Sequence, residues 1–127
     1  MAVGIGLTKH TNGLVERTLR DNRCYLQVEL YSERFDDLKK SLHTALPYAQ
    51  ATGVKRVHLM AGIANRSDNK AVEAFYKSVA TAAEFFEPHG LDVVIEPINA
   101  RNVPGYFLND FTFAYELINE LRIANLK

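Results

Sequence analysis

The chain has 127 residues, enough for one domain with one modest hydrophobic core. Fifteen Lys plus Arg balance fifteen Asp plus Glu, so the formal net charge is zero and the basic surface that DNA or RNA binding needs is missing. A single cysteine, Cys24, excludes an internal disulfide framework, and no apolar run approaches the roughly 20 residues that span a bilayer.

These properties predict a cytoplasmic protein whose partners include neither nucleic acid nor a membrane. Residues 1–9 lack a basic n-region and contain too short an apolar core for a signal peptide. The lone Cys24 fits a reducing compartment. A neutral chain also lacks the charge repulsion that would oppose self-association.

A strand-then-helix rhythm begins near residue 24. Residues 24–31 are rich in β-formers and predict a strand. Residues 35–51 carry apolar side chains at helical spacing, and Gly53 is expected to end this helix. Residues 56–61 predict the next strand.

The second half of the chain repeats the rhythm. Ser67 or Asp68 is expected to cap a helix that Pro88 and Gly90 end. Residues 91–98 predict the third strand, and the apolar run that Glu96 ends is the pattern of a strand in a parallel sheet covered on both faces. A third helix is expected to begin at a cap formed by Asn109 or Asp110.

The predicted strands start more than thirty residues apart, the spacing of βαβ units with parallel strands and right-handed crossovers. We therefore predict a single α/β domain over residues 1–127, with the repeated units in residues 24–127. Residues 1–23 have no firm assignment, since 3–7 favours a short strand and 14–20 a short helix.

Glu96 is the main candidate for a site residue. It lies at the C-terminal end of the third predicted strand, where α/β folds place their chemistry. Pro97 has no N–H to donate, so regular pairing weakens just past Glu96. A solvated or paired strand end is the alternative interpretation of the same carboxylate.

Three other residues are candidates for binding substrate. His58 shares a strand face with Met60 and is either a ligand contact or a hydrogen-bonded, barrel-lining histidine. Arg101 follows Glu96 in the next loop and suits an anionic substrate, with simple surface solvation as the alternative. Asn99 either touches the ligand or forms a turn.

Two loops also belong to this end of the sheet. Asn65, Arg66 and Ser67 follow the second strand and are expected either to bind a carboxylate or phosphate or to cap the next helix. Residues 103–107 contain Pro104 and Gly105 and are expected to shape a loop in which Tyr106 or Phe107 packs over the strand ends.

From about Phe35 to Lys127 the chain resembles the hydroxypyruvate isomerase family, part of the xylose-isomerase-like group of TIM barrels. The segments that carry the resemblance are 58–62 (HLMAG), 91–99 (LDVVIEPIN), 103–108 (VPGYFL) and 125–127 (NLK). The resemblance implies a barrel of about twice this length, of which the chain would hold the fourth and fifth strands. We therefore predict a half-barrel over about residues 24–127.

Members of that family interconvert hydroxypyruvate and tartronate semialdehyde through an enediol, with a divalent metal, Mg²⁺ or Mn²⁺. Glu96 matches the glutamate of the fifth strand, which serves there as metal ligand and as acid/base residue. The partner glutamate and the other ligands lie on later strands that have no counterpart in this sequence. The resemblance therefore implies a site that one copy of the chain leaves incomplete.

Three functions stay open at this point. The first is an isomerase of a small hydroxy-keto acid, whose site a homodimer completes by bringing two Glu96 residues together. The second is a non-catalytic half-barrel that binds a ligand or a partner chain through its strand edges. A structural alternative to the dimer is that residues 1–20 add a strand to the sheet and give a flavodoxin-like sandwich. The third, a relative of the zinc endonucleases, is disfavoured by the neutral charge and the lack of clustered histidines.

Overall fold

The computed structural model describes residues 25–27 and 35–127. Its sheet has three parallel strands in the order β1 (Tyr25–Gln27), β2 (Arg56–Met60) and β3 (Asp92–Val94). The predicted parallel α/β architecture is thus confirmed. The first predicted strand, 24–31, is described only over β1, and the segment 1–23 lies outside the described residues.

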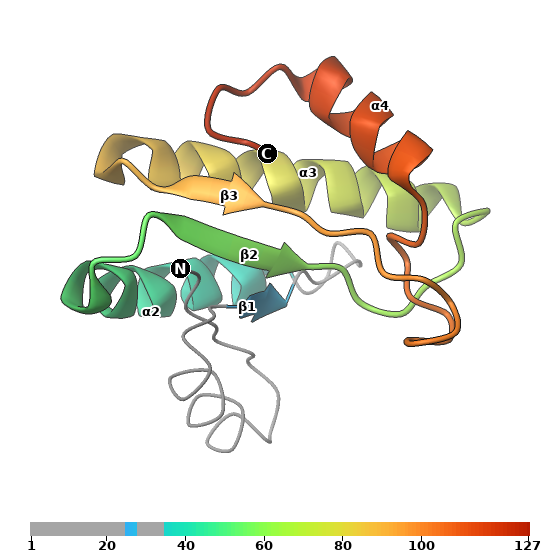
Figure 1. The fold of residues 1–127 in the computed structure, drawn as a ribbon, viewed down its shortest axis with the longest axis horizontal. Helices are drawn as coiled ribbons and strands as arrows, with labels where there is room; N and C mark the ends of the chain where they lie inside the picture. The colour runs from blue at the N-terminus through green and yellow to red at the C-terminus, as the bar shows by residue number, and fades with distance from the viewer. Residues whose placement is uncertain (1–24, 28–34) are drawn as a thin grey trace.

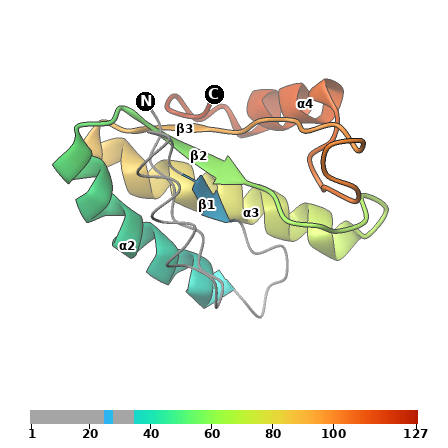
Figure 2. The ribbon, with the colours of Figure 1, turned by 60° about the horizontal axis from the view of Figure 1, so that its bottom comes forward.

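The helices follow the predicted order and nearly the predicted bounds. They are α2 (Phe35–Thr52), α3 (Asn69–Phe86) and α4 (Phe111–Leu121), with a short 3₁₀ turn, η2 (Glu87–His89), after α3. Figures 1 and 2 show α2 and α3 on the same face of the sheet and α4 beyond β3. The result is a sheet with a single helix-covered face, as in one segment of a barrel wall.

Local capping explains where the helices begin and end. Asp68 caps α3 by accepting a hydrogen bond from Lys70 N at 3.0 Å, and Asp110 caps α4 by accepting one from Phe113 N at 2.8 Å. The second member of each predicted pair is therefore the cap. Gly53 and Gly90, with φ of +68° and +67°, follow α2 and η2 in the left-handed conformation that glycine adopts without strain.

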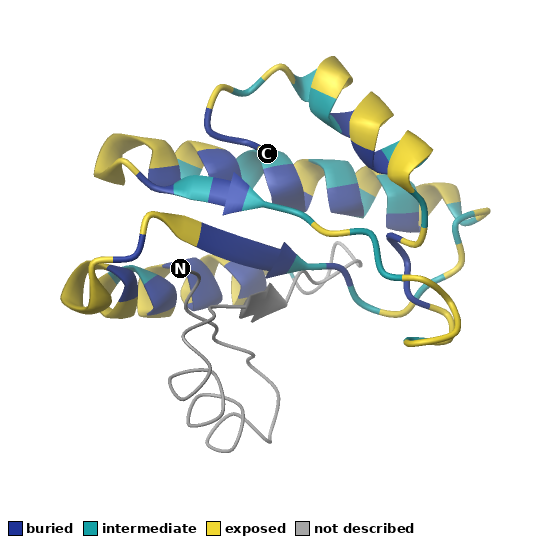
Figure 3. Cartoon of the chain, in the orientation of Figure 1, coloured by how far each residue is buried: buried dark blue, intermediate teal, exposed yellow. Residues whose placement is uncertain are grey.

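The hydrophobic core lies between the sheet and the two helices. Val57 and Leu59 of β2 and Val93 of β3 are fully buried, and they belong to one cluster with side chains of α2 and α3 such as Leu42 and Phe75. Burying each such side chain contributes roughly 1.5–3 kcal/mol. Figure 3 shows this buried layer along β2 and the sheet-facing sides of the helices.

The other face of β2 carries Arg56, His58 and Met60, because side chains alternate along a strand. In a barrel this face turns inward, away from the helices. The strand also changes partners along its length: Val57 pairs with Val93 of β3, whereas Leu59 pairs with Leu26 of β1. A stagger of this kind is what tilts strands in a closed barrel.

The predicted strand 91–98 is wrong in length, because regular β3 covers only Asp92–Val94. Asp92 and Val94 are half-buried, so the expectation of a strand fully covered on both faces is also wrong. Pairing with β2 ends at Val94, and beyond it Ile95 N donates to Lys127 O at 3.0 Å on the opposite side of the strand. Glu96 therefore stands past the end of the ladder.

The C-terminal residues continue the sheet beside β3. Val93 N donates to Asn125 O at 2.7 Å, and Lys127 N donates to Val93 O at 2.8 Å, which gives a parallel bridge between Val93 and Leu126. The buried Asn125 side chain fixes this pairing, because its Nδ2 donates to Ala83 O at 2.8 Å and to Leu91 O at 3.0 Å.

The outer surface of α4 exposes two aromatic residues one turn apart, Phe111 at 79% and Tyr115 at 70%. The opposite side of this helix buries Ala114 and Leu117. In the part of the chain that the structure describes, no helix is long and apolar enough to cross a membrane.

The Asn125 contacts give the first prediction. Asn125→Ala removes the Nδ2 donor from the carbonyl of Leu91 and from that of Ala83, which keeps its bond from Glu87 N, so we expect the free energy of unfolding to fall by about 1–3 kcal/mol. Urea unfolding measures the change. Asn119→Ala, on the exposed side of α4, is the control and should leave the midpoint nearly unchanged. Equal midpoints for both variants would contradict the anchoring role.

Candidate active site at the strand ends

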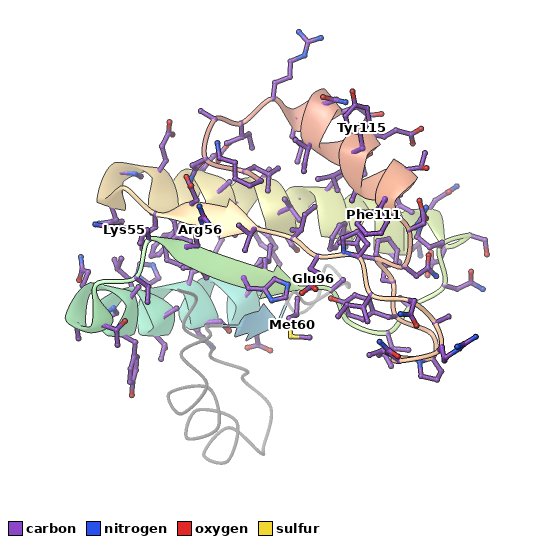
Figure 4. All side chains as sticks on the ribbon, in the orientation of Figure 1. Lys55, Arg56, Met60, Glu96, Phe111 and Tyr115 are labelled. Atoms are coloured by element: carbon purple, nitrogen blue, oxygen red, sulfur yellow. The ribbon has the colours of Figure 1, made fainter. Side chains whose placement is uncertain are left out.

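The sequence candidates meet at the C-terminal end of β2 and β3, but only two of them come into contact. Glu96 Oε2 lies 3.8 Å from His58 Nε2, with the Glu96 side chain 69% exposed and the His58 side chain 8% exposed. This distance suits an ion pair when His58 is protonated but exceeds hydrogen-bond range. Figure 4 shows Glu96 near Met60, at the opposite end of β2 from Lys55 and Arg56.

The position of Glu96 follows from the local sequence. Glu96 lies two residues past the end of β3, and Pro97 has no N–H with which to extend the ladder. The Glu96 carboxylate therefore lies beyond the paired strands and is exposed to solvent. His58 pairs with Val94 in the sheet and lies on the barrel-facing side of β2. An exposed carboxylate beside a buried imidazole is a combination suited to proton transfer.

Tyr106 is the site residue whose role the sequence did not reveal. Residues 103–107 were expected to put Tyr106 or Phe107 over the strand ends, and both are buried. The Tyr106 hydroxyl accepts a hydrogen bond from Ala61 N at 2.9 Å, just past β2. Only the choice of Tyr rather than Phe at this position could have suggested a polar role.

The same loop is held against the segment that follows β2. Ile63 and Tyr106 form an antiparallel bridge, Phe107 N donates to Gly62 O at 3.0 Å, and Gly105 takes φ of +76°. A Cβ on Gly105 would lie 3.1 Å from Ile63 Cγ2, so the approach of the two segments favours glycine there.

Burial raises the pKa of Tyr106 to about 12, and the negative charge of Glu96 adds to the rise while the Ala61 N–H opposes it. The phenol therefore remains protonated at neutral pH. It can donate or accept a hydrogen bond, and it does not act as a base.

Asn99 and Arg101 lie in the loop after Glu96. Asn99 Oδ1 accepts hydrogen bonds from the N–H groups of Arg101 and Asn102, both at 3.0 Å. Asn99 therefore forms a turn, which is one of the two roles predicted for it. Arg101 is exposed. Contact of either residue with a substrate stays a prediction.

Arg66 has a structural role. Its Nη1 donates to Asp110 Oδ2 at 2.8 Å, and its guanidinium lies 3.7 Å from the centre of the Phe113 ring. The backbone N–H of Phe113, together with Arg66, holds the pKa of Asp110 below its usual value. Asn65 Oδ1 accepts from Ser67 N and Ser67 Oγ, so these residues build the turn into α3.

A pocket of about 440 Å³ opens between these loops. Its lining joins the segment after β2 to the loop before α4, and consists of Ile63, Ala64, Asn65, Arg66, Gly105, Tyr106 and Asn109. The pocket lies at the end of the sheet that also carries Glu96.

The described residues do not complete a metal site. Within residues 25–27 and 35–127, no group of three or more His, Cys, Asp or Glu side chains could hold a metal ion. Glu96 and His58 supply two ligating side chains, and Mg²⁺ and Mn²⁺ take six ligands. Water, substrate or residues from beyond the described part of the chain would have to fill the other positions.

Comparison with known proteins decides the family. The family model of the xylose isomerase-like TIM barrel matches residues 24–127. The chain belongs to this family. The described sheet, with parallel strands and helices on one face, is a partial barrel of the predicted kind.

Curated relatives carry isomerase names. A Caenorhabditis elegans protein named "Putative hydroxypyruvate isomerase" is 43% identical over 93 residues, which cover 72% of this chain and 36% of that protein. A "2-oxo-tetronate isomerase" of Cupriavidus necator is 37% identical over 93 residues, with the same coverage of 72% and 36%. The chain therefore spans about a third of the length of these curated relatives.

A solved structure supports the same fold. The chain superposes on the crystal structure of "AP endonuclease, family 2" from Brucella melitensis with a TM-score of 0.71 and 26% sequence identity. The match covers 89% of this chain and 50% of the endonuclease chain. The structural likeness therefore extends over half of the endonuclease chain.

The raised pKa of Tyr106 predicts an alkaline transition. The pKa of its phenol is 10.0 in the unfolded chain and about 12 in the folded one, so its contribution to stability is complete below pH 10 and is lost as the pH rises toward 12. We expect tyrosinate absorbance to show late-titrating tyrosines, of which Tyr106→Phe lacks one while Tyr76, whose pKa is also raised by burial, remains. A wild type and a variant that titrate alike would contradict the buried phenol.

Proposed function

We propose that the chain is an isomerase of small hydroxy-keto acids, in which Glu96 moves a proton between adjacent carbons. The observation that carries the proposal is the Glu96 carboxylate, exposed beyond β3 and 3.8 Å from the His58 imidazole. The isomerase names of the curated relatives support the reaction class.

Hydroxypyruvate illustrates the reaction. Glu96 removes a proton from the hydroxymethyl carbon, and the electrons of that C–H bond form the double bond of an enediolate with the former ketone carbon. The hydroxymethyl oxygen gives up its proton and the former ketone oxygen gains one, so that the hydroxymethyl carbon becomes an aldehyde while Glu96 returns its proton to the former ketone carbon, giving tartronate semialdehyde. Atoms and charge balance without any added oxidant or reductant.

The chain's own residues supply binding and orientation. His58 faces Glu96 and, when protonated, would fix the carboxylate by ion pairing. Arg101, exposed in the following loop, suits the substrate carboxylate, and Asn99 holds that loop in its turn. The protonated Tyr106 holds the loop over the strand ends by accepting the hydrogen bond from Ala61 N.

A second copy of the chain would complete the site. Proton transfer on both faces of a substrate needs a second acid/base group, and a divalent metal needs more ligands than Glu96 and His58. A homodimer that closes the partial barrel would bring two Glu96 residues to one cavity. Mg²⁺ or Mn²⁺ would suit the resulting oxygen ligands.

The cytoplasmic location of the protein remains a prediction.

The test is turnover of hydroxypyruvate with Mg²⁺ or Mn²⁺. We expect Glu96→Gln to lose activity by at least about 100-fold, because Gln cannot accept the proton. Glu84→Gln, on the exposed side of α3, is the matched control and should keep full activity. Circular dichroism should show both variants folded, and sedimentation should show the active wild type as a dimer.

A ligand-binding module without catalysis is the second candidate function. The lack of any group of three or more His, Cys, Asp or Glu side chains among the described residues favours it, since Glu96 alone is too little for two-sided proton transfer. If folded wild type and Glu96→Gln are equally inactive with every metal, or if the wild type stays monomeric at all concentrations, the isomerase proposal is wrong. The binding module then becomes the better account.

A further inference from the structure

The helices α2, α3 and α4 form a layer with α3 between the other two, and aromatic side chains fill both of its seams (Figures 1 and 2). Between α2 and α3, the rings of His43 and Phe85 lie edge to face with their centres 4.8 Å apart. Between α3 and α4, the Phe113 ring centre lies 6.3 Å from that of Phe75 and 6.0 Å from that of Tyr76. In a closed barrel every helix of the outer ring has a neighbour on each side, whereas among the described residues α2 and α4 each have one.

The sides of α2 and α4 that are turned away from α3 carry exposed aromatic side chains. Phe111 and Tyr115 (Figure 4) are each two residues from Phe113, about 160° round the helix, so they point away from the seam with α3. Tyr48, 41% exposed, is five residues from His43, about 140° round α2, so it also points away from α3. We call the α4 surface with Phe111 and Tyr115 and the α2 surface with Tyr48 the outer flanks.

Exposed apolar residues therefore gather where the helix layer lacks a neighbour. Among the described residues four large hydrophobic side chains are exposed, and three of them lie on the outer flanks. The fourth, Ile63, lies at the strand ends. Single exposed hydrophobic residues are common on protein surfaces, but a patch at each end of one layer indicates contact with another protein.

Direction and charge match the two outer flanks to each other. The strands are parallel, so the helices that follow them run in one direction, and α4 beside α2 of a second copy would meet it N-terminal half to N-terminal half. Phe111 would lie beside the exposed pair of Asp37 and Lys40 in the first turns of α2. Arg122, which follows α4, would lie beside Tyr48 and the C-terminal carbonyls of α2, whose last turn has no basic residue of its own. A cation would thus meet an aromatic ring at each end of the seam.

We propose that the outer flank of α4 packs against the outer flank of α2 of a second copy of the chain. The contact forms twice in a symmetric pair, because each copy offers both flanks. The inference rests on the homodimer of the proposed function, and it names the surfaces that hold that homodimer together. The formal net charge of zero leaves no net repulsion between the copies.

Sedimentation equilibrium of the whole chain tests the aromatic contact. We expect the double variant Phe111→Ser, Tyr115→Ser to raise the dissociation constant of the dimer at least about 100-fold, because the dimer loses four aromatic rings from its two seams. Ile63→Ser is the matched control, since it removes a comparably exposed apolar side chain outside the outer flanks and should associate as the wild type does. All three positions are exposed, so circular dichroism should show both variants folded.

A pair of charge changes tests which helices meet. Tyr48→Arg sets two cations against each other at both seams, so we expect it to weaken the dimer at least about tenfold. Adding Arg122→Glu to the same chain replaces each repulsive pair with an attractive one and should restore most of the lost affinity. Restoration requires positions 48 and 122 of different copies to lie together, because they lie at opposite ends of the helix layer within one copy.

Three outcomes would overturn the inference: a wild type that stays monomeric at all concentrations, a Phe111→Ser, Tyr115→Ser variant that dimerises like the wild type, or a Tyr48→Arg chain that Arg122→Glu does not rescue. If Tyr48→Arg leaves the dimer unchanged, another segment of the second copy covers α4. Turnover plays no part in these measurements. A dimer that responds as expected but is inactive refutes only the isomerase function, and an active dimer that ignores the substitutions refutes only this interface.

Discussion

The hydrogen bond from Ala61 N–H to the Tyr106 hydroxyl supports the arrangement of the strand ends. β2 and β3 pair only as far as His58 and Val94, so the backbone beyond them needs another partner. The phenol provides it for Ala61 from a loop 45 residues further along the chain. This contact holds the loop over the strand ends, where it walls the pocket and leaves Glu96 free.

The sequence predicted the architecture well because the architecture depends on periodicity. Val57 and Leu59 alternate with His58, and the apolar side chains of α2 and α3 repeat at helical spacing, so strands and helices were legible from local pattern. Glu96 was found for a similar reason, since a carboxylate that ends an apolar strand has a known place in a parallel sheet.

Long-range contacts were the part that local pattern could not give. β3 ends at Val94, where its pairing with β2 ends, and not at residue 98, and Ile95 N has its partner, Lys127 O, far away in the sequence. Arg66 was a candidate for anion binding until the fold brought Asp110 and Phe113 to it. Such pairings are decided by tertiary structure. For the same reason the sequence could not decide whether Asn99 forms a turn or binds a ligand, or whether Ser67 binds an anion or helps to begin the helix.

The exposed aromatic pair on α4 has a consequence for the behaviour of the chain in solution. Phe111 and Tyr115 present their rings to water, while equal numbers of acidic and basic residues leave no net charge to keep molecules apart. With an isoelectric point near 6.9, the chain has its weakest colloidal repulsion at neutral pH. Solubility should therefore be lowest near neutrality and rise on either side of it, and charged residues at positions 111 and 115 would be the simplest way to keep concentrated samples dispersed.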